Sequence, residues 1–333
     1  MIHTMSVVVP VYAGEQTLEG VVAELEQLTT ENVSPGGSRY VVSEVVLVHD
    51  RGPDRSDETI RALTARYSWV RPVWLSRNFG QHAATLAGVS ASSGAWIVTM
   101  DEDGQHDPAA IGALLDVAVG EQRQVVYARP SNPRPHGWAR NTASWLAKFA
   151  GRMMTGGQLS EFHSFRLVHG EVGRGMAAFC GPGVYLDVAL NWVASRPGHC
   201  PVAMRDEGDR QSGYSWRRLL SHFWQLVISS GTRPLRMVSV VGLLMSLSGF
   251  GLAIYAISRR LLNEVDVAGW TSVFVAVLII GGFLMLAIGV VAEYVAVAVG
   301  MAMGKPLYLV VSDPQSGVLG DRSSRPGPAI ESP

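Results

Sequence analysis

The chain has 333 residues, of which 17% are charged, and its formal net charge is −1 at pH 7. This length allows one sizeable domain plus an appendage, and the balanced charge argues against a nucleic-acid partner, which would normally require a basic surplus. The two cysteines, Cys180 and Cys200, form no CxxC pair, which argues against a disulfide framework and against a cysteine-based zinc site.

From residue 5 to about residue 205, short apolar runs alternate with amphipathic stretches. The apolar runs predict strands at residues 6–10, 44–49, 71–75 and 96–100. The amphipathic stretches predict helices at residues 17–28, 57–67 and 81–91. Strands that alternate with helices indicate a mostly parallel sheet flanked by helices, and ligands of such sheets bind beyond the carboxyl ends of the strands. Polar clusters follow several of the predicted strands, so a site is expected there.

The later part of the chain predicts a membrane anchor. Residues 237–257 and 270–292 lack charged side chains, and each is roughly 20 residues long, enough for a helix to cross a bilayer. Residues 214–230 form an amphipathic pattern that suits a helix in the membrane interface. The alternative is a pair of buried helices in a soluble domain. No signal peptide is expected, because the first apolar run ends at Pro10.

The distribution of basic residues predicts the orientation of this anchor. Four arginines precede the first apolar stretch and Lys305 follows the second, whereas the intervening loop mixes Arg259 and Arg260 with two acids. Two spans place both chain ends on one side of the membrane, and the basic bias favours the cytoplasm. The sequence therefore predicts an integral membrane protein with a cytoplasmic N-terminal domain.

The strongest candidate site follows the fourth predicted strand and has the sequence Asp101-Glu102-Asp103-Gly104-Gln105-His106. Carboxylates at i and i+2 with an amide at i+4 bring hard oxygen ligands around one point. Such ligands suit Mg²⁺ or Mn²⁺, which bind diphosphate oxygens. An acid-rich turn without a metal is the alternative, and a bare Asp-x-Asp pair would favour it. The strand context and the flanking sequence favour the metal site.

Three further segments accompany this cluster, and they are Pro10-Val11-Tyr12, Val48-His49-Asp50-Arg51-Gly52-Pro53-Asp54 and Ser76-Arg77-Asn78-Phe79-Gly80. In order and spacing the four segments resemble family-2 glycosyltransferases, and most closely the polyprenyl-phosphate group that includes dolichol-phosphate-mannose synthase. The resemblance extends over roughly residues 5–310. It implies a GT-A type α/β fold with a mostly parallel sheet flanked by helices, followed by an interfacial amphipathic helix and two transmembrane helices.

The resemblance also implies roles for individual residues around the nucleotide-sugar. Asp101, Asp103 and Gln105 would bind the metal, Mg²⁺ or Mn²⁺. The donor would be bound by Pro10, Tyr12, Glu15, Asp50, Asp54, Arg77, Asn78, Asp101 and Glu102. Ala13 replaces a usual asparagine and His49 replaces a usual aspartate, so the choice between a UDP- and a GDP-linked donor stays open.

A lipid phosphate needs cations near the membrane, and the resemblance implies a set of acceptor residues. Arg140 and Ser144 match an Arg-x-x-x-Ser of the family, and Glu161 opens a segment similar to Asp-Phe-Gly-x-Phe-Arg-Leu. The usual arginine of a later segment would be replaced by Arg205 or Arg210. Arginine suits bidentate recognition of oxyanions, although each arginine alone fits a surface role equally well. With Asp103, we expect Glu161, Arg140, Ser144 and Arg210 to form the catalytic set.

These features predict a catalytic domain at 1–212, an interfacial helix at 213–234, a two-helix anchor at 235–300 and a tail at 301–333 that is largely disordered after 312. The predicted activity is inverting, metal-dependent transfer of one sugar from a nucleotide-sugar to a polyprenyl phosphate, with a possible homo-oligomer. The alternatives are a glycosyltransferase acting on a lipid-linked saccharide or another membrane acceptor, and a non-catalytic nucleotide-sugar-binding protein.

Overall fold

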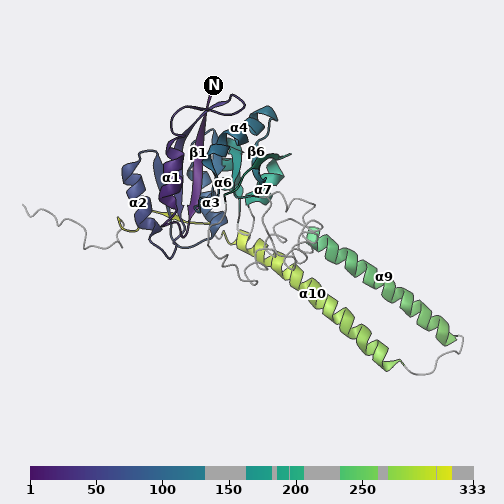
Figure 1. The fold of residues 1–333 in the computed structure, drawn as a ribbon. Coiled ribbons are helices and arrows are strands. Elements are labelled where there is room, and N and C mark those ends of the chain that lie inside the picture. Colours follow the sequence, from purple (N-terminus) through teal and green to yellow (C-terminus); the bar gives the residue numbers. More distant parts are fainter. Residues whose placement is uncertain are drawn as a thin grey trace, which may run out of the picture.

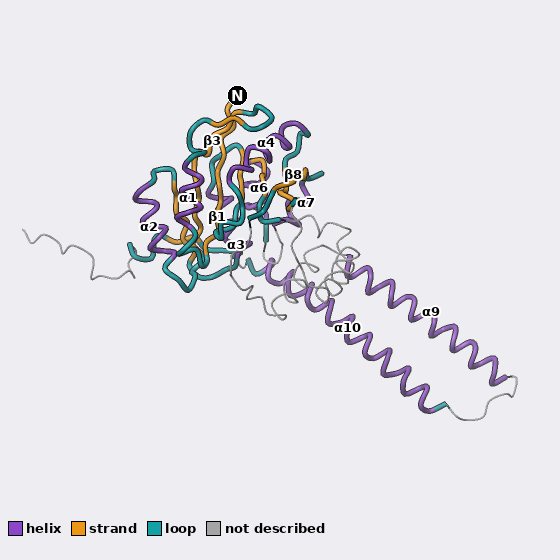
Figure 2. The backbone as a smooth tube through the Cα atoms, viewed as in Figure 1, coloured by secondary structure: helices purple, strands orange, loops and turns teal. Residues whose placement is uncertain are grey.

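The computed structural model describes residues 1–131, 163–181, 186–194, 196–205, 233–261, 269–304 and 306–316. Within these ranges, one mixed sheet with helices on both faces forms a domain, and two long helices extend away from it (Figures 1 and 2). The N-terminal part therefore has the α/β architecture that the alternating pattern predicts.

The sheet contains nine strands, in the order β8-β6-β7-β5-β1-β3-β4-β9, with β2 paired to β3. The strands are β1 (Ile2–Val11), β2 (Asn32–Val33), β3 (Arg39–His49), β4 (Val70–Leu75), β5 (Trp96–Thr99), β6 (Val125–Pro130), β7 (Arg166–His169), β8 (Gly198–Val202) and β9 (Val310–Val311). The central strands β5, β1, β3 and β4 are parallel, whereas β7 pairs antiparallel with both β5 and β6. The carboxyl ends of the four central strands consequently meet at one edge of the sheet.

The helices divide between the two faces of the sheet. They are α1 (Leu18–Glu26), α2 (Ser56–Arg66), α3 (Gln81–Ala91), η1 (Pro108–Ala110), α4 (Ile111–Gly120), α6 (Gly170–Phe179) and α7 (Leu186–Val193). Apolar side chains of α1, α2 and α4 pack on one face, and those of α3, α6 and α7 pack on the other. The valine-rich central strands are buried on both faces, as parallel strands covered by helices require.

The predicted elements agree with these bounds to within a few residues at most ends. The helix predicted at 81–91 coincides with α3, and the strand predicted at 96–100 corresponds to β5. The first and second strands begin earlier than predicted, at Ile2 and Arg39, because their amino-terminal extensions pair with each other across the sheet.

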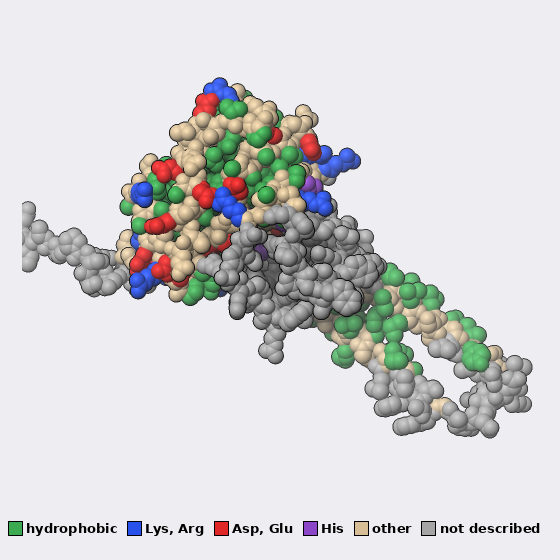
Figure 3. Space-filling view, viewed as in Figure 1, with side chains coloured by type: hydrophobic (Ala, Val, Ile, Leu, Met, Phe, Trp, Pro, Cys, Tyr) green, Lys and Arg blue, Asp and Glu red, His purple; other side chains and the backbone are tan. Residues whose placement is uncertain are grey.

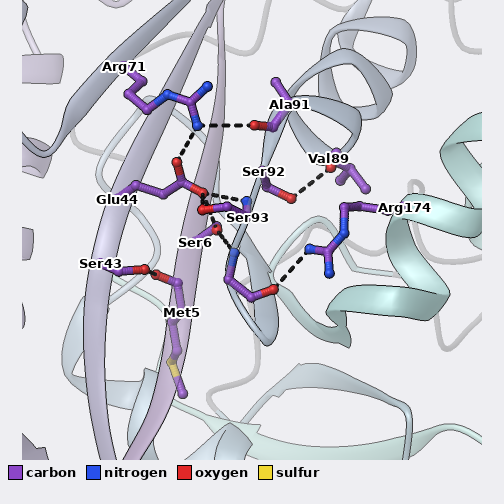
Figure 4. A network of polar contacts seen from close by, with 11 residues as sticks. Met5, Ser6, Ser43, Glu44, Arg71, Val89, Ala91, Ser92, Ser93 and Arg174 are labelled. Atoms are coloured by element: carbon purple, nitrogen blue, oxygen red, sulfur yellow. Dashed lines mark hydrogen bonds and ion pairs between the residues drawn. The ribbon is translucent and has the colours of Figure 1, made fainter.

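A buried carboxylate, Glu44, joins the middle of β1 and β3 to the start of β4 (Figure 4). Glu44 accepts hydrogen bonds from the hydroxyl of Ser6 at 2.6 Å and that of Ser93 at 2.7 Å, and it pairs with Arg71 at 2.5 Å. The Ser6 hydroxyl accepts the Gly94 N–H at 2.7 Å. Burial acts to raise the pKa of Glu44, but these hydrogen bonds outweigh it and leave the pKa lowered. The network ties β1, β3 and β4 to the loop before β5, which fixes the relative heights of their carboxyl ends.

Two helices, α9 (Arg233–Leu261) and α10 (Trp270–Ala302), project side by side from the domain (Figure 1). Both predicted apolar stretches are therefore helical. Within the part of the chain that the structure describes, one stretch, Ile279–Ala302, is long and apolar enough to cross a membrane, and the apolar stretch Val238–Gly251 of α9 is shorter. Among the described side chains of both helices, many large hydrophobic ones are exposed on the surface (Figure 3).

Candidate active site at the carboxyl ends of the strands

Asp101 lies two residues after the end of β5, and three neighbours determine the position of its carboxylate and backbone. Gln81 at the start of α3 donates to Oδ1 at 2.6 Å, and the hydroxyl of Ser164 donates to Oδ2 at 2.6 Å. The N–H of Asp101 donates to Nδ1 of His106 at 3.0 Å, and burial lowers the pKa of that imidazole. His106 also stacks on Phe165. The carboxylate therefore has a defined orientation while it is only half-buried.

Asp103 belongs to the turn that follows. Its Oδ1 accepts the N–H of Gln105 at 3.0 Å, and the turn passes through Gly104 at a φ of 76°, a conformation that favours glycine. The carbonyl of Gln105 accepts the N–H of Arg205 at 3.1 Å, which fixes the turn to the segment after β8. The second oxygen of Asp103 is not used by this turn.

The donor chemistry of Asp101 and Asp103 fits a hard divalent cation. Within the described ranges no three His, Cys, Asp or Glu side chains are grouped closely enough to hold a metal ion. A two-carboxylate site nevertheless suits Mg²⁺, which usually keeps several waters and binds through one or two carboxylates plus substrate phosphates. A carboxylate has about four lone-pair sites, so the contacts from Gln81 and Ser164 leave capacity on Asp101.

Glu102 lies between these two acids and has a different position. Its Oε2 accepts the N–H of Tyr12 at 2.8 Å and its Oε1 accepts the N–H of Ala13 at 2.9 Å. Burial raises the pKa of Glu102, and the two backbone donors oppose that rise. Glu102 thus joins the β5 turn to the loop after β1, and it leaves Tyr12 half exposed beside the site, at 45%.

Asp50, at the end of β3, shapes a second loop. Its carboxylate is 3% exposed and accepts the N–H groups of Phe79 at 2.7 Å and Gly80 at 2.8 Å. Burial raises the pKa of Asp50, against the effect of these two donors. The guanidinium of Arg77 lies over the Phe79 ring at 4.1 Å. Asp50 therefore fixes the loop of residues 76–80, which we call the donor loop, and both oxygens contact backbone in this structure.

Asp54 and Glu15 cross-link the loops after β1 and β3. Asp54 accepts the N–H of Glu15 at 2.9 Å, and Glu15 accepts the N–H of Arg55 at 3.1 Å. Gly52 lies so close to the first loop that a Cβ there would be 1.4 Å from the carbonyl oxygen of Tyr12. The two loops form one layer above the strand ends.

A polar cavity of about 170 Å³ opens beneath Asp101. Its lining comes from the ends of β1 and β5, the first turns of α3, the approach to β7 and the start of α7, and consists of Pro10, Gln81, His82, Thr85, Thr99, Met100, Asp101, His163, Ser164, Arg166 and Asp187. Small-molecule sites commonly span about 300–1,000 Å³, so the cavity suits one part of a ligand, such as a sugar ring.

A buried ion pair forms the wall of this cavity. Arg166 is 3% exposed and pairs with Asp187, which also accepts the hydroxyl of Tyr127 at 3.1 Å. The Nε of Arg166 donates to the hydroxyl of Thr99 at 3.1 Å. Burial lowers the pKa of Arg166. Separating the two partners would leave an uncompensated buried charge, which is strongly unfavourable. The pair therefore stays together and gives the cavity a rigid polar wall.

The structure thus gathers the predicted donor residues around the strand ends, with Pro10 buried and Arg77 and Asn78 exposed. The predicted acceptor residues Arg140, Ser144, Glu161 and Arg210 lie outside the described residues, as does the predicted interfacial helix at 214–230. Arg205 contacts Glu24 at 2.8 Å and Asp107 at 3.1 Å, so its guanidinium binds acids of the domain.

Several residues of the site are assigned no role by the sequence predictions. Gln81, Ser164 and His106 position Asp101, and Asp187 neutralises Arg166. Ser164 and Arg166 lie in the segment similar to Asp-Phe-Gly-x-Phe-Arg-Leu, which was a usable signal. Asp187 follows no motif, and only the pairing of β7 with β5 beside α7 brings it close.

Solved structures and curated proteins show similarity over most of the chain. The crystal structure of glucosyl-3-phosphoglycerate synthase from Mycobacterium tuberculosis, with Mn²⁺, UDP-glucose and phosphoglyceric acid, is 19% identical, with a TM-score of 0.48 over 69% of this chain and 79% of that chain. The undecaprenyl-phosphate 4-deoxy-4-formamido-L-arabinose transferase of Edwardsiella ictaluri is 29% identical over 93% of this chain and 94% of the relative. The protein of the same name from Pseudomonas paraeruginosa is 31% identical over 93% of this chain and 90% of the relative.

The model of the family described as "Glycosyl transferase family 2" matches residues 6–176, just over half of the chain. This range contains β3, β4 and β5, the greater part of β1, the turn at Asp101 and the donor loop. The family match and the 31% identity along nearly the whole chain show that this protein belongs to glycosyl transferase family 2 and is a glycosyltransferase.

Proposed function

We propose that the chain transfers one sugar from a nucleotide-sugar to a polyprenyl phosphate at the cytoplasmic face of a membrane, with inversion at the anomeric carbon. Two relatives that match over nine-tenths of their length are named as undecaprenyl-phosphate sugar transferases. The observation that carries the proposal is the pair Asp101 and Asp103 at the tip of β5, beside a polar cavity and in a chain with a membrane-length apolar helix.

The nucleotide-sugar would lie across the loops after β1, β3 and β4. Tyr12 is half exposed and can pack on the base, whereas Asp50, Glu102 and Asp54 fix the loops around it. The diphosphate would lie toward Asp101 and Asp103. The sugar would lie in the cavity, against the wall formed by Arg166 and Asp187. The contacts between the loops would orient the nucleotide-sugar, and such positioning of a substrate is a major source of rate enhancement.

Asp101 and Asp103, with Gln105, would hold Mg²⁺ or Mn²⁺, which when bound acts as a Lewis acid on the diphosphate and offsets the charge of the leaving group. In the transfer itself, an oxygen of the lipid phosphate forms a bond to the anomeric carbon. The bond to the nucleoside diphosphate breaks, and its electron pair leaves with the diphosphate. The acceptor oxygen is already an anion near neutral pH, so no strong general base is required.

The membrane helices give this chemistry its location. A polyprenyl chain stays in the bilayer, so the catalytic domain must be tied to the membrane surface. The apolar stretch of α10 supplies one span, and α9, which runs beside it, would supply the second. Arg140, Ser144 and Arg210 would bind the lipid phosphate, and Glu161 would orient it.

The test is a transfer assay with the full chain in detergent or nanodiscs. A panel of UDP- and GDP-sugars is combined with polyprenyl phosphate, and the lipid products are identified by mass spectrometry. We expect one donor to yield a lipid-monophosphate sugar. Asp103→Asn should lower the rate at least 100-fold, an effect of the size of losing about 3 kcal/mol of electrostatic stabilisation. The variant should keep the wild-type melting temperature.

The choice of acceptor separates this proposal from its rivals. Polyprenyl-diphosphate-linked sugar is offered in a parallel reaction, and sugar addition to it alone would favour a transferase acting on lipid-linked saccharides. Full activity in Asp103→Asn would refute the assignment of the strand-end acids.

A further inference from the structure

A short segment after the membrane helix returns to the catalytic domain and contacts the sheet. We call residues 306–316 the strap. Its strand β9 pairs antiparallel with β4, with Val310 opposite Leu75 and Val311 opposite Trp74. The carbonyl of Leu309 accepts the N–H of Ser76 at 2.9 Å, which is the first residue of the donor loop. Figure 1 shows the strap crossing from the end of α10 toward α2.

An ion pair fixes the far end of the strap to α2. The guanidinium of Arg61 donates to both oxygens of Asp313, at 2.8 and 2.9 Å, and also to Asp57 at 2.8 Å. It lies over the ring of Trp74, 4.8 Å from the centroid. The Arg61 and Asp313 side chains are only 21% and 24% exposed, so solvent screens this bidentate pair less than it screens an open surface pair.

The ion pair matters because the rest of the attachment is small. β9 contains two residues, and so short a strand gives few backbone hydrogen bonds. Burial of Leu307 and Tyr308 against the α3 face adds apolar contact. Without Arg61 and Asp313, the strap would lose the contact that fixes its register against β4.

The donor loop lies between this strap and Asp50. On one side Asp50 accepts the N–H groups of Phe79 and Gly80. On the other side Leu309 accepts the N–H of Ser76, and Phe79 packs in the same apolar cluster as Leu307 and Tyr308. A shift of the strap would therefore move the loop that follows β4.

We propose that Asp313 is a positioning residue for the nucleotide-sugar. Through the strap it sets the conformation of the donor loop, and it couples that loop to the end of the membrane helix α10. The proposal rests on the proposed function, because it assigns the nucleotide to the pocket that the donor loop borders. Asp313 acts on the nucleotide only through the loop and does not contact it.

The test compares Asp313→Asn with the wild-type full chain. Affinities for UDP and for GDP are measured by calorimetry, the donor KM and kcat by the transfer assay, and amide exchange at residues 76–80 by mass spectrometry. We expect a nucleotide Kd and a donor KM raised about three- to tenfold, the range for losing a partly buried ion pair. The kcat and the KM for polyprenyl phosphate should stay within about twofold, and the donor loop should exchange faster.

Asp57→Asn is the matched control, because it removes the other carboxylate bound to Arg61 but leaves the strap in place. It should leave the nucleotide Kd and loop exchange within about twofold of wild type, and Asp313→Glu should recover most of the affinity. An unchanged Kd and unchanged exchange in Asp313→Asn, or equal effects of Asp57→Asn, would overturn the proposal.

Nucleotide affinity and loop exchange do not require the acceptor, so they test the strap even if polyprenyl phosphate proves to be the wrong substrate. If the wild-type chain binds neither UDP nor GDP, loop exchange alone decides. Faster exchange confined to Asp313→Asn supports the strap, and identical exchange in both variants rejects it.

Discussion

His49 is a buried residue at the end of β3 whose two ring nitrogens have no hydrogen-bond partner. Its ring packs edge-on against Trp74 at 5.3 Å between centroids. Burial lowers the pKa of His49, and the positive charges of Arg51 and Arg61 add to this effect, against the nearby carboxylates. The imidazole is therefore neutral in the folded chain at neutral pH.

This environment predicts an acid sensitivity of the fold. The unfolded chain has a His pKa of about 6.5, above that of the folded chain, so below pH 6.5 the unfolded state takes up a proton that the folded state does not. Stability is therefore lost as the pH falls below about 6.5. For one proton the slope reaches at most about 1.4 kcal/mol per pH unit.

We expect His49→Leu to reduce this loss, measured as the free energy of unfolding in urea between pH 7.5 and pH 5. His106, whose pKa is also lowered by burial, is present in both proteins, so the difference between the two curves isolates His49. Parallel curves for the variant and the wild type would contradict the expectation.

Among the elements of the fold, the loops that form the site pack so closely that a larger side chain does not fit between them. The loops after β1 and β3 contact each other through Gly52, where a Cβ would collide with the carbonyl oxygen of Tyr12 at 1.4 Å. Backbone cannot move aside as a flexible side chain can, so any side chain at position 52 must displace one of the two loops.

Gly52→Ala should therefore lower the free energy of unfolding by about 1–3 kcal/mol, the usual cost of overpacking. It should also raise the donor KM, because the displaced loop carries Tyr12. Gly20→Ala is the control, since Gly20 lies in the first turn of α1 and its Cβ would meet nothing within 4 Å. That variant should be more stable by about 0.5–1 kcal/mol. Chemical denaturation measures the change in stability of the two variants, and the transfer assay measures the donor KM. A Gly52→Ala protein as stable as wild type would show that the two loops can move apart at no cost.

Much of the central fold could be predicted because local patterns determine it. Valine-rich runs and amphipathic stretches up to β5 predicted helices and strands that the structure confirms. The pairings of β7 and β9 could not be predicted in this way. They join segments that are distant along the chain, as with Arg61 and Asp313, which are 252 positions apart. The contact of Ser164 with Asp101 depends on the pairing of β7 with β5, whereas the acids themselves stand out in the sequence at a strand end.

The whole molecule has two parts with different surfaces. Charged side chains are visible on the sheet domain, whereas hydrophobic side chains are visible on the two long helices (Figure 3). The strap links them, since it begins just after α10 and ends on α2. The domain is thus attached to the helices both through the chain before α9 and through β9. This double attachment is expected to restrict how the strand ends can face the membrane.

The proposed pair of membrane spans predicts on which side of the membrane each end of α10 lies. If both helices cross the membrane, as proposed, Gly269→Cys at the start of α10 and Ser316→Cys in the strap lie on opposite sides of it, with Ser316 on the cytoplasmic side. A membrane-impermeant maleimide should label the first variant in intact cells and the second only after permeabilisation. The native cysteines should react slowly with the maleimide, because Cys200 is buried and burial raises the pKa of Cys180 to about 11. Failure to label Gly269→Cys in intact cells would contradict the proposal that α9 and α10 both span the membrane.

The most direct test of the whole account measures the release of free nucleoside diphosphate by the full chain when polyprenyl phosphate is added. With the correct nucleotide-sugar and Mg²⁺ or Mn²⁺ present, release should rise in proportion to the lipid phosphate and stop when a chelator is added. The rate of release should be at least 100-fold lower in Asp103→Asn. Release that is equal with and without the lipid phosphate, or that survives both the chelator and the substitution, would contradict the account.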